Sequence, residues 1–277
     1  MTIVLGDFHM HSQFCPHGSD DTMEQYVQKA IEQGLQAVSF TEHAPLPLEF
    51  TDPAPTNDSV MNWHDVDVYL KEGNRLKQKY KQNIVVHIGF EVDYLLGFEK
   101  ETEKVLNQLG SNIDDAILSV HMLKAPNDTY VCLDYSANEF GRIVDLFGSI
   151  DRVYDAYFNT LKAAIASDLG AYKPKRIGHI SLIDKFHKQF HPVRHIEPVL
   201  EEILDLMKQK HYSLDVNTAG FYKEWCGVSY PAPEIITLAA EKGIPLVPGS
   251  DSHLAEHVGR GFDRLPSDLL FSLPTRS

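Results

Sequence analysis

The sequence contains little cysteine and no long apolar run, and both shortages limit what the protein can be. Its 277 residues include three cysteines, Cys15, Cys132 and Cys226, which are odd in number and far apart, so no disulfide framework is indicated. No apolar run is long enough to span a bilayer, and the first residues lack the basic and apolar segments of a signal peptide. We therefore expect a cytoplasmic protein with no membrane partner.

Basic residues are also scarce relative to acidic ones. The 25 Lys and Arg residues against 39 Asp and Glu residues give a formal net charge of -14. Because nucleic acids attract positively charged surfaces, this balance argues against a nucleic-acid partner. The sequence also lacks a Gly-rich phosphate loop, a Gly-x-Ser-x-Gly elbow and a Cys-x-x-Cys pair, so the chemistry of these three motifs is not indicated.

Short apolar runs alternate with helix-like segments along the chain. The patterns predict strands at residues 3–5, 35–40, 84–90, 115–120, 175–178, 212–216 and 244–248. They predict helices at residues 22–33, 66–81, 99–109, 154–169, 197–210 and 233–242. Seven strand-then-helix units in a single domain over residues 1–277 favour an α/β fold, a distorted (β/α)7 TIM-like barrel. An open doubly wound sheet is the second choice.

Two long segments between these elements are predicted to be irregular. Residues 44–65 contain prolines at positions 45, 47, 53 and 55, which exclude regular structure there. This segment is either a lid over a substrate or a surface excursion. Residues 122–141 are predicted to form a second loop.

Histidine and carboxylate side chains gather where the predicted strands end. His9 and His11 alternate with Met10, so an extended strand would direct both imidazoles to one side, about 6.6 Å apart. The other strand ends carry Glu42, His43, Glu91, His121, His179, Asn217, Asp251 and His253. In a barrel the carboxyl ends of the strands meet at one face, where active sites lie. An open sheet would spread the same residues along a crevice.

These donors predict a metal site. The candidates are His9, His11, His17, His43, Glu91, His121, His179, Asp251 and His253. A catalytic zinc-like ion needs about three or four protein ligands, so this set, with one bridging carboxylate, is enough for two or three ions. Imidazole with carboxylate suits zinc, iron or manganese better than magnesium or calcium. Glu42 adjoins His43 and is expected to support the ligands rather than to bind an ion.

The order and spacing of the motifs resemble the PHP (polymerase and histidinol phosphatase) family over nearly the whole chain. The resemblance is carried by His9-x-His11, His17, Glu42-His43, Gly89-Phe90-Glu91-Val92-Asp93-Tyr94, Ser119-Val120-His121, Gly178-His179 and Gly249-Ser250-Asp251-Ser252-His253. The segments 14–18, 89–94, 173–179 and 217–220 resemble the stand-alone histidinol-phosphatase branch of that family. The likeness implies a distorted seven-stranded barrel that holds three divalent transition-metal ions.

Carried onto this sequence, the resemblance implies three groups of ligands. The first ion would use His9, His11, Glu91 and Asp251. The second ion would share Glu91 and add His121 and His179, and the third would use His17, His43 and His253. The implied reaction is hydrolysis of L-histidinol phosphate, a small-molecule ester, to L-histidinol and phosphate in histidine biosynthesis.

Cationic side chains are expected to neutralise the phosphate of such a substrate. Arg176 is the first candidate, because a guanidinium binds phosphate bidentately. Lys223 and Arg260 are further candidates. Arg176, Asp251 and His253 are the predicted catalytic residues, with Asp251 or a protonated histidine donating a proton to the leaving alkoxide.

The remaining substrate contacts are assigned more loosely. Asn217 and Glu42 are predicted to bind the substrate, and Glu42, Asp93 or an acid within residues 44–65 could pair with its amine. Two other functions stay open. One is a PHP-type phosphoesterase that acts on a nucleotide or another small phosphate ester, and the other is a barrel that only binds metal or a partner. The cysteines are interpreted as ordinary thiols, although Cys132 in its loop stays open as a ligand. The sequence does not indicate an oligomeric state.

Overall fold

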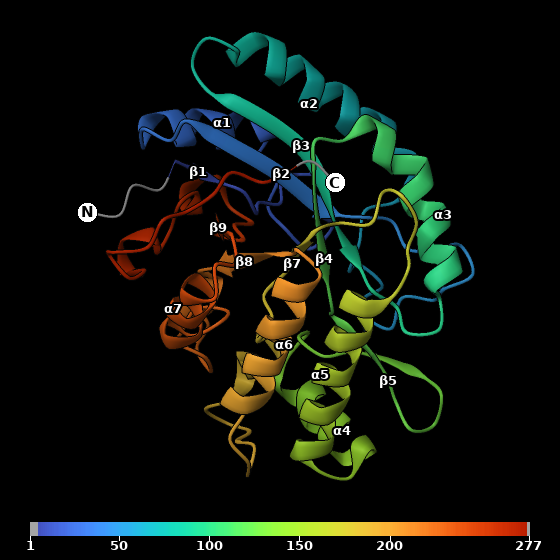
Figure 1. Ribbon diagram of the computed structural model, residues 1–277. Helices are drawn as coiled ribbons and strands as arrows, with labels where there is room; N and C mark the ends of the chain where they lie inside the picture. The colour runs from blue at the N-terminus through green and yellow to red at the C-terminus, as the bar shows by residue number, and fades with distance from the viewer. Residues whose placement is uncertain (1–4, 276–277) are drawn as a thin grey trace.

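The computed structural model describes residues 5–275, and its centre is a parallel sheet closed into a barrel (Figure 1). Seven strands follow the order β1-β2-β3-β4-β7-β8-β9, each parallel to its neighbour. They are β1 (Gly6–Asp7), β2 (Ala37–His43), β3 (Val85–Asp93), β4 (Asp115–Ser119), β7 (Arg176–Ile177), β8 (Ser213–Asn217) and β9 (Leu246–Gly249). The backbone N–H groups of Phe8 and Asp251 donate to Pro248 and His9 at 3.0 and 2.8 Å, which joins the first strand to the last. The predicted (β/α)7 barrel is confirmed.

Helices cover the outside of this barrel (Figure 1). They are α1 (Met23–Glu32), α2 (Val66–Tyr80), α3 (Glu99–Leu109), α4 (Ala137–Phe147), α5 (Ile150–Ala166), α6 (Glu197–Gln209) and α7 (Pro233–Glu241). Hydrogen bonds from capping side chains determine where a helix begins, as α1 shows. Thr22 and Gln25 form a reciprocal capping box at the start of α1, which satisfies backbone donors that a helix start leaves free. All six predicted helices are present, with bounds shifted by at most a few residues.

One sequence prediction about the fold needs correction, and one is mostly untested. Residues 122–141 are not a loop, because they contain a hairpin of β5 (Met122–Lys124) and β6 (Tyr130–Cys132) and the start of α4. Ser136 caps α4 by accepting a hydrogen bond from the backbone N–H of Glu139 at 3.1 Å, and the helix buries an apolar face against the core. The first predicted strand, 3–5, falls largely outside the described residues, and the observed pairing begins at Gly6.

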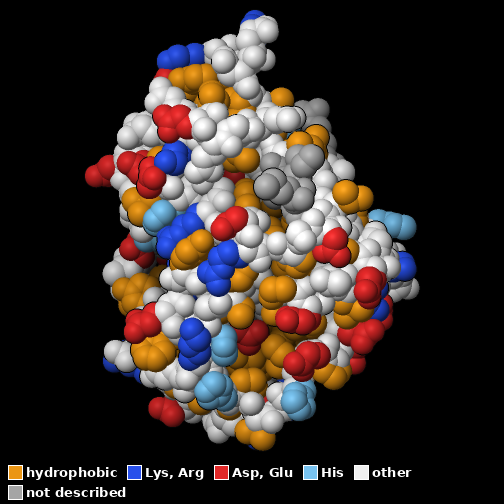
Figure 2. All heavy atoms as spheres, turned by 90° about the vertical axis from the view of Figure 1, so that its left-hand side faces the viewer, with side chains coloured by type: hydrophobic (Ala, Val, Ile, Leu, Met, Phe, Trp, Pro, Cys, Tyr) orange, Lys and Arg blue, Asp and Glu red, His pale blue; other side chains and the backbone are white. Residues whose placement is uncertain are grey.

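Charge is mixed on the surface that Figure 2 shows, where acidic, basic and histidine side chains are interspersed. This face does not carry the continuous basic stripe that is typical of nucleic-acid binding. Within residues 5–275, no helix combines the length and the apolar character needed to cross a membrane.

Candidate metal centre

The carboxyl ends of the barrel strands bring the predicted ligands together beside a cavity of about 580 Å³. Seven of the nine ligands line this cavity, and His9 and His11 are fully buried next to them. Each ligand comes from the end of a strand or from the loop directly after it. The parallel strands therefore bring residues that are far apart in the sequence to one face of the barrel, as the barrel prediction required.

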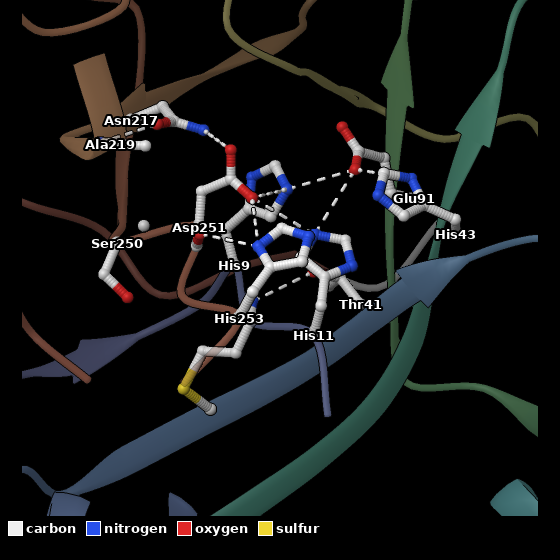
Figure 3. A network of polar contacts seen from close by, with 12 residues as sticks. His9, His11, Thr41, His43, Glu91, Asn217, Ala219, Ser250, Asp251 and His253 are labelled. Carbon is white, nitrogen blue, oxygen red and sulfur yellow. Dashed lines mark hydrogen bonds and ion pairs between the residues drawn. The ribbon is translucent and has the colours of Figure 1, made fainter. Parts of the chain in front are cut away.

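The first predicted group is the most compact. His9 Nε2 lies 3.2 Å from Glu91 Oε2 and 3.8 Å from Asp251 Oδ1. His11 Nε2 lies 3.5 and 3.3 Å from the same two oxygens (Figure 3). Ligands at the corners of a tetrahedron with bonds of about 2.1 Å are about 3.4 Å apart. These four atoms therefore surround a space that fits one transition-metal ion.

The second group surrounds the other carboxylate oxygen of Glu91, Oε1. His179 Nε2 is 2.8 Å from Glu91 Oε1 and 3.1 Å from His121 Nε2, and His121 Nε2 is 3.7 Å from the same oxygen. Ser119 Oγ donates a hydrogen bond to Glu91 Oε1 at 2.5 Å. Glu91 thus presents one oxygen to each of the first two groups, as a bridging carboxylate must.

The third group is formed by three imidazoles near the cavity entrance. The His17 ring centroid lies 5.1 Å from that of His43 and 5.2 Å from that of His253. The buried sulfur of Cys15 is also close, since it lies within 4.8 Å of a ring nitrogen of His11, His43 and His253. The interpretation of Cys15 as an ordinary thiol therefore missed its position beside the metal ligands.

The hydrogen bonding of the imidazoles fits metal binding. His121 Nδ1 lies 2.8 Å from Asp93 Oδ1, and His17 Nδ1 lies 2.8 Å from the backbone oxygen of Asp58. Each contact leaves Nε2 free to bind an ion. Buried atoms without a hydrogen-bond partner among the described residues include His9 Nε2, His11 Nε2, Glu91 Oε2 and His253 Nε2. Unpaired buried polar atoms are costly, and a divalent cation at these groups would satisfy them.

The carboxylates make this end of the barrel strongly negative. Burial opposes protonation of His121, but Asp93 and Glu91 outweigh it and raise the pKa of this imidazole to about 10. Burial likewise disfavours the charged form of Glu91, yet the surrounding imidazoles, led by His9, hold the pKa of this carboxyl well below its ordinary value. Around Glu91 and Asp93 the site therefore favours positive charge. At His43 and His253, by contrast, burial and the neighbouring imidazoles hold the pKa well below its ordinary value, which keeps these rings neutral and able to bind an ion.

Arg176 does not reach the cavity, which corrects its predicted roles in catalysis and phosphate binding. Its side chain is 3% exposed inside the barrel, and its Nη2 donates to Asp115 Oδ2 at 2.7 Å. Arg176 is the first residue of the two-residue strand β7. Its side chain lies one layer of side chains below the strand ends rather than at the rim of the barrel.

Glu42 and Asn217 are also buried away from the cavity, so neither is in a position to contact a substrate. Glu42 Oε1 accepts hydrogen bonds from the backbone N–H and the hydroxyl of Ser12 at 2.7 and 2.6 Å. Burial raises the pKa of this carboxyl to about 8, although the hydrogen bonds from Ser12 lower it. The expected supporting role of Glu42 agrees with this position.

The cavity wall contains the other predicted cations. Lys223 and Arg260 both line it, and sequence reasoning missed Lys185 and Asp134 beside them. Lys185 Nζ lies 2.9 Å from Asp134 Oδ2. Both residues lie in segments without a strand-end pattern, so the sequence offered no signal for them.

The proline-rich segment 44–65 reaches the same cavity. Its residues Ala54, Thr56, Asp58 and Ser59 contribute to the wall. The contact between Asp58 and His17 holds the segment against the third group. Of the two interpretations left open, the structure favours a segment that covers the site over a remote surface excursion.

Comparison with known proteins agrees with this arrangement. The family model of the PHP domain matches residues 7–219, and the model of a PHP-associated region matches residues 234–268. The chain belongs to the PHP family. A histidinol-phosphatase of Bacillus subtilis is 41% identical to it over 259 residues, which cover 93% of this chain and 96% of that relative.

Two solved structures of family members share the fold. A proposed histidinol phosphatase from Listeria monocytogenes superposes with a TM-score of 0.89 at 40% identity, covering 93% of this chain and 98% of that one. The histidinol phosphate phosphatase of Lactococcus lactis, solved with zinc, L-histidinol and phosphate, has a TM-score of 0.63 at 21% identity, covering 91% and 88%. At that identity, the second comparison supports the fold alone.

Proposed function

We propose that this protein is a metal-dependent phosphomonoesterase that hydrolyses L-histidinol phosphate to L-histidinol and phosphate in histidine biosynthesis. The observation that carries the proposal is the set of four donor atoms from His9, His11, Glu91 and Asp251, which lie 3.2 to 3.8 Å apart across the group. The second and third groups adjoin it in one cavity. The PHP family membership and the 41% identical histidinol-phosphatase support the choice of reaction and substrate.

The ligand sets proposed for three ions are those predicted from the sequence. Glu91 is shared between the first two groups, and His17, His43 and His253 form the third. Zinc, iron and manganese all suit these donors. When bound, such ions polarise phosphate oxygens and lower the pKa of a bound water.

The chain's own residues would orient and neutralise the ester. Lys223 and Arg260 line the cavity wall, where their positive charges can contact phosphate oxygens. The Arg260 guanidinium lies 3.4 Å above the centre of the Tyr222 ring, which restricts its orientation before a substrate enters. Asp251 and His253 stay the proposed catalytic residues, because both border the cavity. The pKa of each lies well below its ordinary value, because burial disfavours the charged form of His253, whereas at Asp251 the imidazoles outweigh burial and stabilise the carboxylate. Their proposed role is therefore to hold ions at the reacting phosphate rather than to donate a proton.

The amine of L-histidinol phosphate also needs a partner. Asp58 in segment 44–65 lines the cavity, and among the described residues no ion pair joins it to a lysine or an arginine. Asp134 also lines the cavity, but its carboxylate already pairs with Lys185. Asp93, another of the candidates that the sequence left open, lines the cavity too, but its carboxylate already contacts His121 Nδ1 at 2.8 Å. We therefore assign the amine contact to Asp58, an acid of segment 44–65.

The test is phosphate release from L-histidinol phosphate by protein loaded with manganese or zinc. A panel of sugar phosphates, nucleotides and a phosphodiester is assayed beside it. Selective turnover of L-histidinol phosphate supports the proposal. Preferred turnover of another ester would contradict the substrate, and no turnover by fully loaded protein would contradict the enzymatic function itself.

The assignment of Asp58 has its own test. Asp58→Asn should raise the KM for L-histidinol phosphate while leaving the KM for an uncharged phosphate ester unchanged. An equal rise for both esters would show that Asp58 acts on the segment rather than on the amine.

A further inference from the structure

Three charged side chains lie inside the barrel directly beneath His9. They are Asp115 on β4, Arg176 on β7 and Asp215 on β8, and each is at most 3% exposed. Arg176 Nη2 donates to Asp115 Oδ2 at 2.7 Å, and Arg176 Nη1 lies 3.6 Å from Asp215 Oδ1. The other oxygen of Asp215 lies 2.9 Å from His9 Nδ1. A chain of contacts thus links the middle of the barrel to the first metal group.

The charges of this buried unit do not balance. One guanidinium faces two carboxylates, Asp115 and Asp215, which leaves one negative charge in an environment where an unpaired charge is costly. Among residues 5–275, the only other side chain that forms an ion pair with Asp215 is His9. Positive charge at His9, supplied by an ion on its far nitrogen, therefore compensates the charge of the barrel interior.

Asp215 also determines which ring nitrogen of a neutral His9 carries the proton. Because a carboxylate can only accept a hydrogen bond, the proton of a neutral His9 lies on Nδ1 and the lone pair on Nε2. Nε2 is the atom that faces Glu91 and Asp251. The fit is close, since a Cβ at Gly249 would lie 2.3 Å from the Cβ of His9 and 3.3 Å from Asp215 Oδ1.

The same protein contains a second carboxylate–imidazole contact that lacks this support. Asp93 holds His121 Nδ1 at 2.8 Å, but Asp93 borders the cavity and is 8% exposed. Among residues 5–275, Asp93 forms no ion pair with a lysine or an arginine. The contact between His9 and Asp215 is fully buried and backed by Arg176, so it is the more rigid of the two.

We infer that Asp215 is a positioning residue that fixes His9 for the first metal ion, and that Arg176 acts through Asp215 to hold it in place. This inference rests on the proposed metal site and does not depend on the identity of the substrate. Loss of a partner of this kind lowers metal affinity by about 10- to 100-fold.

The primary test compares Asp215→Asn with Asp93→Asn in the full chain. Manganese affinity is measured by competition with a chelator, and anomalous scattering from crystals assigns each ion to its group. Asp215→Asn should weaken binding at His9 about 10- to 100-fold, whereas Asp93→Asn should weaken binding at His121. Wild-type affinity at His9 in Asp215→Asn would overturn the inference.

A second readout separates positioning from general stability. In zinc-loaded protein, where a metal-bound His9 is neutral, ¹⁵N NMR of the imidazoles reports which nitrogen of His9 carries the proton. Wild-type protein should carry it on Nδ1, and Asp215→Leu should lose that preference. If Asp215→Leu lowers stability but keeps the wild-type His9 signal, the role is structural and the inference fails.

The role of Arg176 is tested in combination. Arg176→Met should weaken manganese binding at His9 in the wild-type background and have little further effect in Asp215→Asn, because both changes break one chain of contacts. Equal losses in the two backgrounds would overturn the coupling. If Arg176→Met does not fold, Arg176→Lys keeps the positive charge but lacks the two donor nitrogens of the guanidinium, and it is measured in the same double-mutant comparison with Asp215→Asn. All these measurements omit substrate, so they stand apart from the phosphatase assay.

Discussion

Asn217 Nδ2 donates a hydrogen bond to Asp251 Oδ2 at 3.0 Å (Figure 3). The contact occupies one carboxylate oxygen and turns the other, Oδ1, toward His9 and His11. The Asn217 side-chain oxygen accepts from the backbone N–H of Ala219 at 3.0 Å, which fixes the orientation of the amide. Asn217 therefore orients Asp251, a ligand of the first metal group, and is not positioned to contact the substrate.

Asn217→Ala should lower the affinity for the first ion and with it kcat, each by about tenfold or more, because Asp251 loses the group that orients it. The measurements are manganese affinity and phosphate release at saturating metal. Recovery of wild-type kcat once metal is saturating would show that the contact affects binding of the ion only. Unchanged affinity and unchanged kcat together would contradict the prediction.

Arg260→Met should reduce kcat/KM for L-histidinol phosphate by about tenfold or more, since a hydrogen bond to a charged group contributes about 1.5 to 3 kcal/mol. Most of the loss should appear in KM if the guanidinium contacts the phosphate in the ground state. Steady-state phosphate release measures both constants.

Arg264→Met is the matched control for that variant. Arg264 also stacks on an aromatic ring, with its guanidinium carbon 4.0 Å from the centre of Phe221, but it does not line the cavity. Its removal should change kcat/KM by less than about twofold, as expected for a surface substitution away from the site. Equal losses for the two arginines would indicate a stability effect.

Removal of metal should abolish activity and lower the free energy of unfolding. An ion that binds only the folded state at 100 times its Kd adds about 2.7 kcal/mol. Dialysis against a chelator, followed by thermal unfolding with and without added manganese, measures this difference. A Tm that does not depend on manganese would contradict a metal site built from buried ligands.

Asp184 should make the stability depend on pH in the weakly acidic range. Burial raises the pKa of this carboxyl from 3.8 to about 7, although the hydroxyl of Tyr154 opposes the shift. The folded protein therefore holds a proton that the unfolded chain releases above pH 4. The contribution of Asp184 to stability is complete below pH 4 and is lost as the pH rises to about 7.

Asp184→Asn removes this titration without removing the polar side chain. Urea unfolding of both proteins between pH 4 and 8 should show that the wild type loses stability relative to the variant as the pH rises, with no further change above pH 8. Parallel curves over the whole range would mean that Asp184 is ionised in the folded protein throughout.

The sequence predicted the barrel and the gathering of its donors at one face because both follow from strand periodicity, whereas the division of the ligands into three groups came from the resemblance to the PHP family. Alternation places His9 and His11 on one side of an extended segment, and parallel strands bring their carboxyl ends together. The nine ligand positions could therefore be named from sequence, although the binding of ions there stays a prediction. The single-domain assignment of 1–277 also stays a prediction.

The same reasoning failed where depth within the barrel matters. Arg176 and Asp215 both lie close to strand ends in the sequence, yet they occupy an inner layer that only the register of neighbouring strands reveals. Asp215 is two residues before Asn217, so the period-2 pattern places both on one face, and this signal could have been used. Helix α4 was missed altogether because the cap at Ser136 and the residues that follow it were interpreted as part of a loop.

Glu91 borders every metal group. Its Oε2 lies 3.2 Å from nitrogens of His9 and His43, and its Oε1 lies 2.8 Å from His179. The first ion to bind would neutralise much of the charge of this one carboxylate and would repel a second cation, so each further ion would bind more weakly than the one before. Under scarcity of metal, a population of these molecules would share the supply evenly instead of dividing into full and empty members.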